Sequence, residues 1–139
     1  MMPFYPTEDK IIPYRKLSSW RSGVGVTDSE YKDGPFDIQL VVTNGCFDIL
    51  HMGHVEYLEE ARRQGDKLLV GVNDDDSVRW LKGKGRPKNC ALHRARVLSA
   101  LECVDYVVIF PSLVQGNAAD FLSKARPKVY VKGGDYSLD

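Results

Sequence analysis

The chain has 139 residues, of which 43% are hydrophobic and 27% charged, and this is the size and composition of one ordinary globular domain. Nineteen basic residues balance nineteen acidic ones, which argues against a nucleic-acid partner held by bulk charge. Three widely spaced cysteines exclude a disulfide scaffold and a CxxC zinc site, and no apolar run reaches the ~20 residues that cross a bilayer, so we expect a reduced, cytoplasmic protein without a membrane partner.

The first 37 residues are predicted to form an irregular N-terminal extension. Prolines and glycines interrupt this stretch, although residues 16–21 suit a short helix with Leu17 and Trp20 on one face. A solvated tail rarely carries as many aromatic residues as this segment does. We therefore expect the extension to pack on the rest of the chain or on a second subunit.

Residues 38–139 alternate between apolar strands and amphipathic helices. Strands are expected at 38–43, 67–72, 104–110 and 129–131, and helices at 53–64, 77–81, 91–101 and 117–125. The strands are apolar on both faces, which is typical of a parallel sheet that is covered on both sides. The pattern predicts a single α/β domain over residues 38–139, with a Rossmann-like, doubly wound parallel sheet and helices on both faces.

Ligands of such sheets bind beyond the carboxyl ends of the strands. The first predicted strand is followed by TNGCFDILHMGH, the second by NDDDS and the fourth by KGGDY. Glycines, polar residues and ionisable residues therefore collect where a ligand would lie.

Several familiar catalytic signatures are missing from these loops. The sequence Gly83-Lys84-Gly85-Arg86 lacks the hydroxyl residue that follows the lysine of a Walker A loop. His51-Met52-Gly53-His54 stands where a dinucleotide fingerprint would need GxGxxG, and no HExxH, GxSxG or kinase motif occurs. These observations weigh against a metalloprotease, a serine hydrolase and a dehydrogenase.

Two of the three histidines, His51 and His54, lie at the start of a predicted helix. Residues three apart share one helical face, and Gly53 between them lets the backbone come close to a ligand. The start of a helix favours an anion, and imidazoles there can donate hydrogen bonds to phosphate oxygens. The alternatives are a zinc site that includes Cys46 and Asp48, and a pair of histidines satisfied within the turn.

The sequence GCFDILHMGH resembles the signature of the cytidylyltransferase-like nucleotidyltransferase superfamily. The longer string TNGCFDILHMGHVEYLEEARRQGD, with LKGKGRP and VKGGDY, is most similar to the adenylyltransferases of ADP-heptose synthesis, which act on D-glycero-D-manno-heptose 1-phosphate. Those enzymes stand alone or form one domain of a bifunctional kinase–adenylyltransferase. The resemblance covers residues 40–136 and implies a Mg²⁺-dependent transfer of AMP from ATP to a sugar 1-phosphate, with release of pyrophosphate.

The resemblance also implies roles for individual residues. As catalytic residues, His51 and His54 would hold the triphosphate and stabilise the pentavalent phosphorus, and Lys84 and Arg94 would face phosphate groups. The glycines beside Lys84 would let its loop close over the ligand. The residues expected to bind the nucleotide are Asn44, Gly45, Cys46, Phe47, Gly53, Arg86, Lys132, Gly133, Gly134 and Asp135.

Structural alternatives stand beside several of these roles. Arg94 would otherwise form a structural salt bridge, and the basic loop at 82–86 would be a solvated surface. Asp48 is expected to cap residues 49–52 or to contact the ligand, and the acids at 74–76 to cap the next helix or to reach Mg²⁺ or the sugar. No protein ligand is assigned to magnesium, because it binds mostly through phosphates and water.

The chain departs from the family pattern at both ends. The family continues past the GGD turn into a strand, a serine–threonine motif and a terminal helix, so we expect either a truncated chain or a protein that lacks that half of the pocket. The extension at 1–37 is longer and less regular than the lead-in that the family usually has. Alternatives to heptose adenylylation are cytidylyl transfer to glycerol 3-phosphate or a similar polyol phosphate, and a non-catalytic nucleotide-binding remnant. A homodimer is expected from the superfamily.

Overall fold

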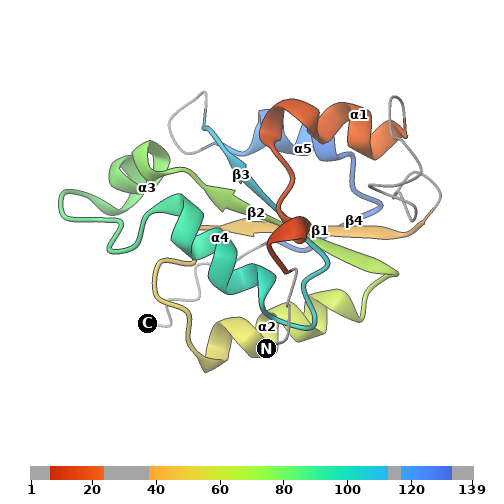
Figure 1. Ribbon diagram of the computed structural model, residues 1–139, viewed down its shortest axis with the longest axis horizontal. Coiled ribbons are helices and arrows are strands. Elements are labelled where there is room, and N and C mark those ends of the chain that lie inside the picture. Colours follow the sequence, from red (N-terminus) through yellow and green to blue (C-terminus); the bar gives the residue numbers. More distant parts are fainter. Residues whose placement is uncertain (1–6, 24–37, 113–116, 133–139) are drawn as a thin grey trace, which may run out of the picture.

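The computed structural model describes residues 7–23, 38–112 and 117–132, and its centre is a parallel sheet. The strands are β1 (Leu40–Gly45), β2 (Lys67–Asn73), β3 (Tyr106–Phe110) and β4 (Val129–Tyr130). Their order is β3-β2-β1-β4 (Figure 1). The chain moves outward from β1 through β2 to β3 and then crosses to the other side of β1, which is the predicted doubly wound topology.

Helices cover both faces of this sheet (Figure 1). They are α1 (Leu17–Ser22), α2 (Met52–Arg62), α3 (Asp75–Lys82), α4 (Ala91–Ser99) and α5 (Ala119–Ala125). Every strand and helix predicted in the body is present, with ends that differ by no more than two residues. The predicted fold class is confirmed.

Two hydrophobic cores fill the space between sheet and helices, because successive residues of a strand point to opposite faces. Leu68 and Val70 of β2 belong to the core that includes Leu58 of α2. Leu69 of the same strand belongs to the other core, with Trp20 of α1 and Phe121 of α5. The sheet is therefore buried on both faces, as its continuous apolar strands predict.

The described part of the N-terminal segment packs on the body. It contains the 3₁₀ turns η1 (Thr7–Lys10) and η2 (Tyr14–Lys16) and then α1, whose Leu17 and Trp20 are buried on one face, as predicted. The backbone N–H of Ile12 donates to the carbonyl of Val107 in the edge strand β3, at 2.8 Å. Residues 24–37 lie outside the described residues, and the boundary at residue 37 stays a prediction.

Candidate functional site

The turn after β1, here called the histidine turn (residues 46–54), joins the central strand to α2. His51 is the N-cap of α2, and its Nδ1 accepts a hydrogen bond from the Gly53 N–H at 3.0 Å. The His54 Nδ1 in turn accepts from the His51 N–H at 3.2 Å. The two imidazoles therefore form a reciprocal cap that satisfies backbone donors which the helix itself leaves unpaired.

This cap fixes which nitrogen of each ring is available to a ligand. Because each Nδ1 accepts a hydrogen bond, each neutral ring carries its proton on Nε2. His51 is exposed and His54 half-buried, with ring centroids 4.0 Å apart. Burial, and then the neighbouring His51, lower the pKa of His54, so its ring is neutral at pH 7. The turn thus presents two adjacent Nε2–H donors.

Glycines in the histidine turn make room for its own rings. A Cβ at Gly53 would lie 2.9 Å from Cε1 of His51, and one at Gly45 would lie 3.0 Å from a ring carbon of Phe47. Phe47 has a left-handed φ of 48°, and its buried ring meets His54 edge-on with centroids 5.5 Å apart. Gly53 was predicted to allow close approach of a ligand. The structure adds a second reason for a glycine here, because the His51 ring occupies the space that a Cβ would take.

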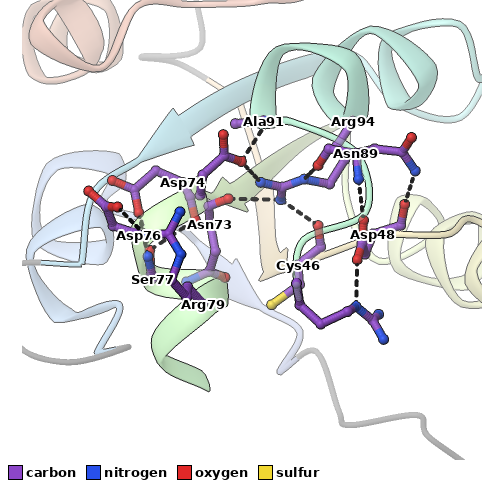
Figure 2. A network of polar contacts seen from close by, with 12 residues as sticks. Cys46, Asp48, Asn73, Asp74, Asp76, Ser77, Arg79, Asn89, Ala91 and Arg94 are labelled. Atoms are coloured by element: carbon purple, nitrogen blue, oxygen red, sulfur yellow. Dashed lines mark hydrogen bonds and ion pairs between the residues drawn. The ribbon is translucent and has the colours of Figure 1, made fainter. Parts of the chain in front are cut away.

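Asp48 holds the basic loop against this turn (Figure 2). Its carboxylate, only 3% exposed, accepts hydrogen bonds from the Arg86 Nε at 2.8 Å and from the N–H groups of Lys88 and Asn89 at 2.8–2.9 Å. Burial acts to raise the pKa of Asp48, but these hydrogen bonds outweigh it and the pKa is lowered. The predicted cap of residues 49–52 is wrong, because the partners lie 38 to 41 residues further along the chain.

Arg94, predicted to face the triphosphate, donates to the protein itself (Figure 2). Its side chain is 1% exposed and pairs with Asp75 at 2.7 Å. Nη1 donates to the carbonyls of Cys46 and Asn73 at 2.7 and 2.8 Å, and Nε donates to the carbonyl of Asn89 at 2.8 Å. The guanidinium thus ties the carboxyl ends of β1 and β2 to the start of α4. These contacts agree with the structural alternative, and a phosphate contact of Arg94 stays a prediction.

The other cations predicted for the site are exposed, apart from the half-buried Arg86. Lys84 stands between Gly83 and Gly85, whose φ angles of 95° and 88° are left-handed. Arg86 is 37% exposed. Lys132 follows β4 and is also exposed. Lys132 follows the carboxyl end of β4, whereas Lys84 and Arg86 lie in the loop after α3 and Arg94 lies within α4.

Two further predicted residues lie at the same edge of the sheet. The amide oxygen of Asn44 accepts a hydrogen bond from the Tyr130 hydroxyl at 2.6 Å, which links β1 to β4. Cys46 is half-buried, and burial raises the pKa of its thiol. Gly133, Gly134 and Asp135 lie outside the described residues, so their predicted contact with the nucleotide stays a prediction.

The acidic run after β2 is occupied by contacts within the chain. Asp74 is the N-cap of α3 and accepts from the Ser77 N–H at 2.9 Å, while Asp76 pairs with Arg79 at 2.8 Å. Within residues 7–23, 38–112 and 117–132, no group of three or more His, Cys, Asp or Glu side chains could hold a metal ion. The acids therefore match the helix-cap alternative. A magnesium ion held through phosphates and water stays a prediction.

Two residues of this network were not assigned to it from the sequence. Asn89 donates from its side chain to the Asp48 carbonyl at 2.7 Å, and Asp75 accepts from the N–H of Ala91 at 2.8 Å. An Asn and an Asp near the start of a predicted helix are typical capping residues, and this was the only sequence feature that pointed to polar contacts of Asn89 and Asp75. Their partners lie 16 or more residues away, which no local pattern reveals.

Known proteins resemble the chain in sequence and in structure. The model of the cytidylyltransferase-like family matches residues 42–139. "Bifunctional protein HldE" of Pseudomonas fluorescens (strain Pf-5) is 57% identical over 101 residues, which cover 73% of this chain and 20% of that protein. The protein of the same name from Pseudomonas putida (strain GB-1) is 56% identical, with 73% and 21% covered. The chain thus spans about a fifth of the length of the curated relatives it matches.

A solved structure supports the same relationship. The lipopolysaccharide core biosynthesis protein from Thermoplasma volcanium GSS1 is 31% identical, with a TM-score of 0.62 that covers 73% of this chain and 80% of that one. None of the helices in the described part of this chain is both long and apolar enough to span a membrane. The family match includes the histidine turn, the basic loop and the Arg94 helix.

Proposed function

This chain belongs to the cytidylyltransferase-like family, and from that premise we propose that it transfers AMP from ATP to a sugar 1-phosphate, with heptose 1-phosphate as the acceptor. The predicted nucleotidyltransferase class agrees with the family, and the choice of nucleotide and acceptor is our proposal. The name of the solved relative, a lipopolysaccharide core biosynthesis protein, supports a sugar acceptor. The observation that carries the proposal is the pair of Nε2–H donors at the start of α2.

In the proposed reaction a phosphate oxygen of the acceptor attacks the α-phosphorus of the nucleotide. The new P–O bond forms as the bond to the bridging α–β oxygen breaks, and pyrophosphate leaves with that electron pair. No covalent intermediate with the protein is needed, so the residues position the reactants and neutralise charge. His51 and His54 would donate from Nε2 to phosphate oxygens whose charge grows in the transition state, beside the positive end of α2.

The basic loop would supply the remaining positive charge. The Arg86 Nε is engaged by Asp48, which leaves both Nη groups for a phosphate. Lys84 stands between two glycines and would reach the ligand from the side of the loop. Magnesium, when bound, would neutralise triphosphate charge while held mainly by phosphate oxygens and water.

The proposal is tested by measuring pyrophosphate release from ATP and from CTP, each with heptose 1-phosphate and with glycerol 3-phosphate. The control is His54→Asn, in which the amide oxygen replaces Nδ1 as an acceptor but nothing replaces Nε2–H. Turnover of ATP with heptose 1-phosphate that is lost in the variant is the expected result. Turnover with CTP alone would favour the cytidylyl alternative, and turnover in none of the four mixtures would favour a nucleotide-binding remnant.

The oligomeric state belongs to the same proposal. We expect the homodimer that the superfamily predicts, and the test is the molecular mass in solution by light scattering. A monomer at the concentrations of the assay would contradict it without bearing on the chemistry.

A further inference from the structure

The segment between α3 and α4, which continues the basic loop to residue 89, has two parts with different contacts. The loop tip (residues 83–85) has left-handed glycines at both ends, and Lys84 makes no polar contact with the part of the chain that the structure describes. The loop base (residues 86–89) is bonded to Asp48 through one side chain and two backbone N–H groups. Glycine adopts these left-handed angles without steric strain, so the tip depends on backbone conformation, whereas the base is held by hydrogen bonds to Asp48.

The loop base is fastened from two sides (Figure 2). Asn89 donates its backbone N–H to the Asp48 carboxylate at 2.9 Å and its side-chain amide to the Asp48 carbonyl at 2.7 Å. The carbonyl of Asn89 accepts from the Arg94 Nε, and the same guanidinium donates to the carbonyl of Cys46. Cys46 and Asp48 both belong to the histidine turn, so these bonds close a ring between the turn and the loop base.

The charge of Asp48 is what suits it to this position. A buried carboxylate that accepts from two backbone N–H groups and a guanidinium forms charge-assisted hydrogen bonds, which are stronger than neutral ones. An amide at this position would keep one acceptor oxygen and turn an N–H₂ group toward the same donors. Replacement by Asn therefore removes bonds and adds a repulsive contact, with little change in size.

We propose that Asp48 is a positioning residue that fixes the loop base so that the Arg86 guanidinium faces phosphate groups bound at the histidine turn. Asp48 engages only the Nε of Arg86, and the two Nη groups have no partner among the described residues. The orientation of the guanidinium is thus set before a ligand arrives, which lowers the entropy cost of binding it. The nature of the phosphate ligand rests on the proposed function, but the attachment of the loop base does not.

Limited digestion with trypsin tests the attachment, because the loop contains its own internal control. Trypsin can cut after Lys84 in the tip and after Lys88 in the base, whereas Pro87 protects the bond after Arg86. In Asp48→Asn, we expect cleavage after Lys88 to be at least about tenfold faster, since charged hydrogen bonds that close the base are lost. Cleavage after Lys84 should change less than about twofold. Equal rates after Lys88 in the two proteins would overturn the proposal.

Two controls separate local opening from global unfolding. Glu60→Gln removes an exposed ion pair with Arg63 and should alter neither cleavage rate. Faster cutting after Lys67, in strand β2, would report that Asp48→Asn unfolds as a whole. In that case Arg86→Lys, which keeps a cation but lacks Nε, should still speed cleavage after Lys88 at least about threefold. An unchanged rate in that variant would overturn the proposal.

A binding measurement tests whether Asp48 acts through Arg86. We expect Asp48→Asn and Arg86→Gln each to weaken the binding of ATP about tenfold, and the double variant to be no more than about twofold weaker than Arg86→Gln alone. Additive losses would mean that Asp48 acts independently, which contradicts a positioning role through Arg86. If the wild-type chain does not bind ATP, the proposed function fails, while the digestion still decides the attachment of the loop.

Discussion

The histidine turn contains a more exposed half, with His51 and His54, and a buried half, with Asp48. The two halves use their polar groups in opposite ways. In His51 and His54, Nδ1 accepts a hydrogen bond in the cap of α2, and Nε2 is available to a ligand. Asp48 is buried with its carboxylate bonded to the loop base, and its neighbour in the network, Arg94, donates to four protein acceptors. A charged residue at the site is therefore not by itself a ligand contact, and its partners decide between contact and positioning.

The largest expected effect comes from Arg94→Gln. Arg94 is buried but its partner Asp75 is 41% exposed, so the main cost is the loss of the donor to the carbonyls that the guanidinium reaches. At about 1–3 kcal/mol for each buried acceptor left without a partner, we expect a loss of about 3 kcal/mol in the free energy of unfolding. Urea denaturation followed by circular dichroism measures it. Arg79→Gln, which breaks the exposed pair with Asp76, is the matched control and should cost less than about 1 kcal/mol. An Arg94→Gln protein that is as stable as the wild type but has lost turnover would indicate that Arg94 contacts the ligand.

In the exposed half, His51→Asn is expected to lower turnover and to leave stability nearly unchanged. Asparagine is a favoured N-cap residue, so α2 keeps its acceptor and the unfolding free energy should change by less than about 0.5 kcal/mol. The lost Nε2–H donor should lower kcat by about 10²–10³-fold, which is typical of removing one donor to developing charge. Steady-state pyrophosphate release is the measurement. A variant with normal turnover would show that this nitrogen does not act on the substrate.

A smaller effect is expected from Gly53→Ala, in which two contributions to stability offset each other. Alanine in a helix is favoured over glycine by about 1 kcal/mol, and loss of the His51 cap costs about the same. The added Cβ would displace the His51 ring, because it would lie 2.9 Å from Cε1. We therefore expect nearly unchanged thermal stability but turnover that falls about tenfold. A stabilised variant with full activity would mean that the ring moves aside without consequence.

The smallest expected effect is the dependence of stability on pH through His54. Its pKa is lower in the folded chain than in the unfolded one, so the unfolded chain binds more protons as the pH falls below about 6.5. The contribution of the reciprocal cap is thus fully present above that pH and is lost as the pH falls through the folded pKa. Denaturation midpoints between pH 7.5 and 5.5 should decline less in His54→Asn than in the wild type. If the denaturation midpoints of the two proteins fall equally with pH, the loss of stability comes from titratable groups other than His54.

Sequence patterns predicted the fold well, because each element carries its own signal. β2 is a continuous apolar run that ends in polar residues, and the helices that cover the sheet show apolar positions on one face. The two histidines were placed together by their spacing alone, since a motif of four residues is local. The same reasoning found that Leu17 and Trp20 face inward.

The buried half of the site was not predictable in this way. Asp48 and Asn89 are 41 residues apart, and their contact depends on how the loop base folds back over the end of β1. Arg94 was assigned to the phosphates by the family resemblance, but its contacts with the carbonyls of Cys46 and Asn73 depend on the register of β1 and β2. Local chemistry identifies candidates, and long-range packing decides which of them face a ligand.

The most direct test of this account is the tautomer of the two histidines, followed by ¹⁵N NMR while ATP is added. We predict that both rings are in the Nε2–H form at pH 8, with Nδ1 held as an acceptor. ATP should shift the Nε2 resonances of His51 and His54 and leave their Nδ1 resonances nearly unchanged. Rings protonated on Nδ1, or Nε2 resonances that do not respond to ATP, would contradict the claim that this turn offers two preset donors to a phosphate.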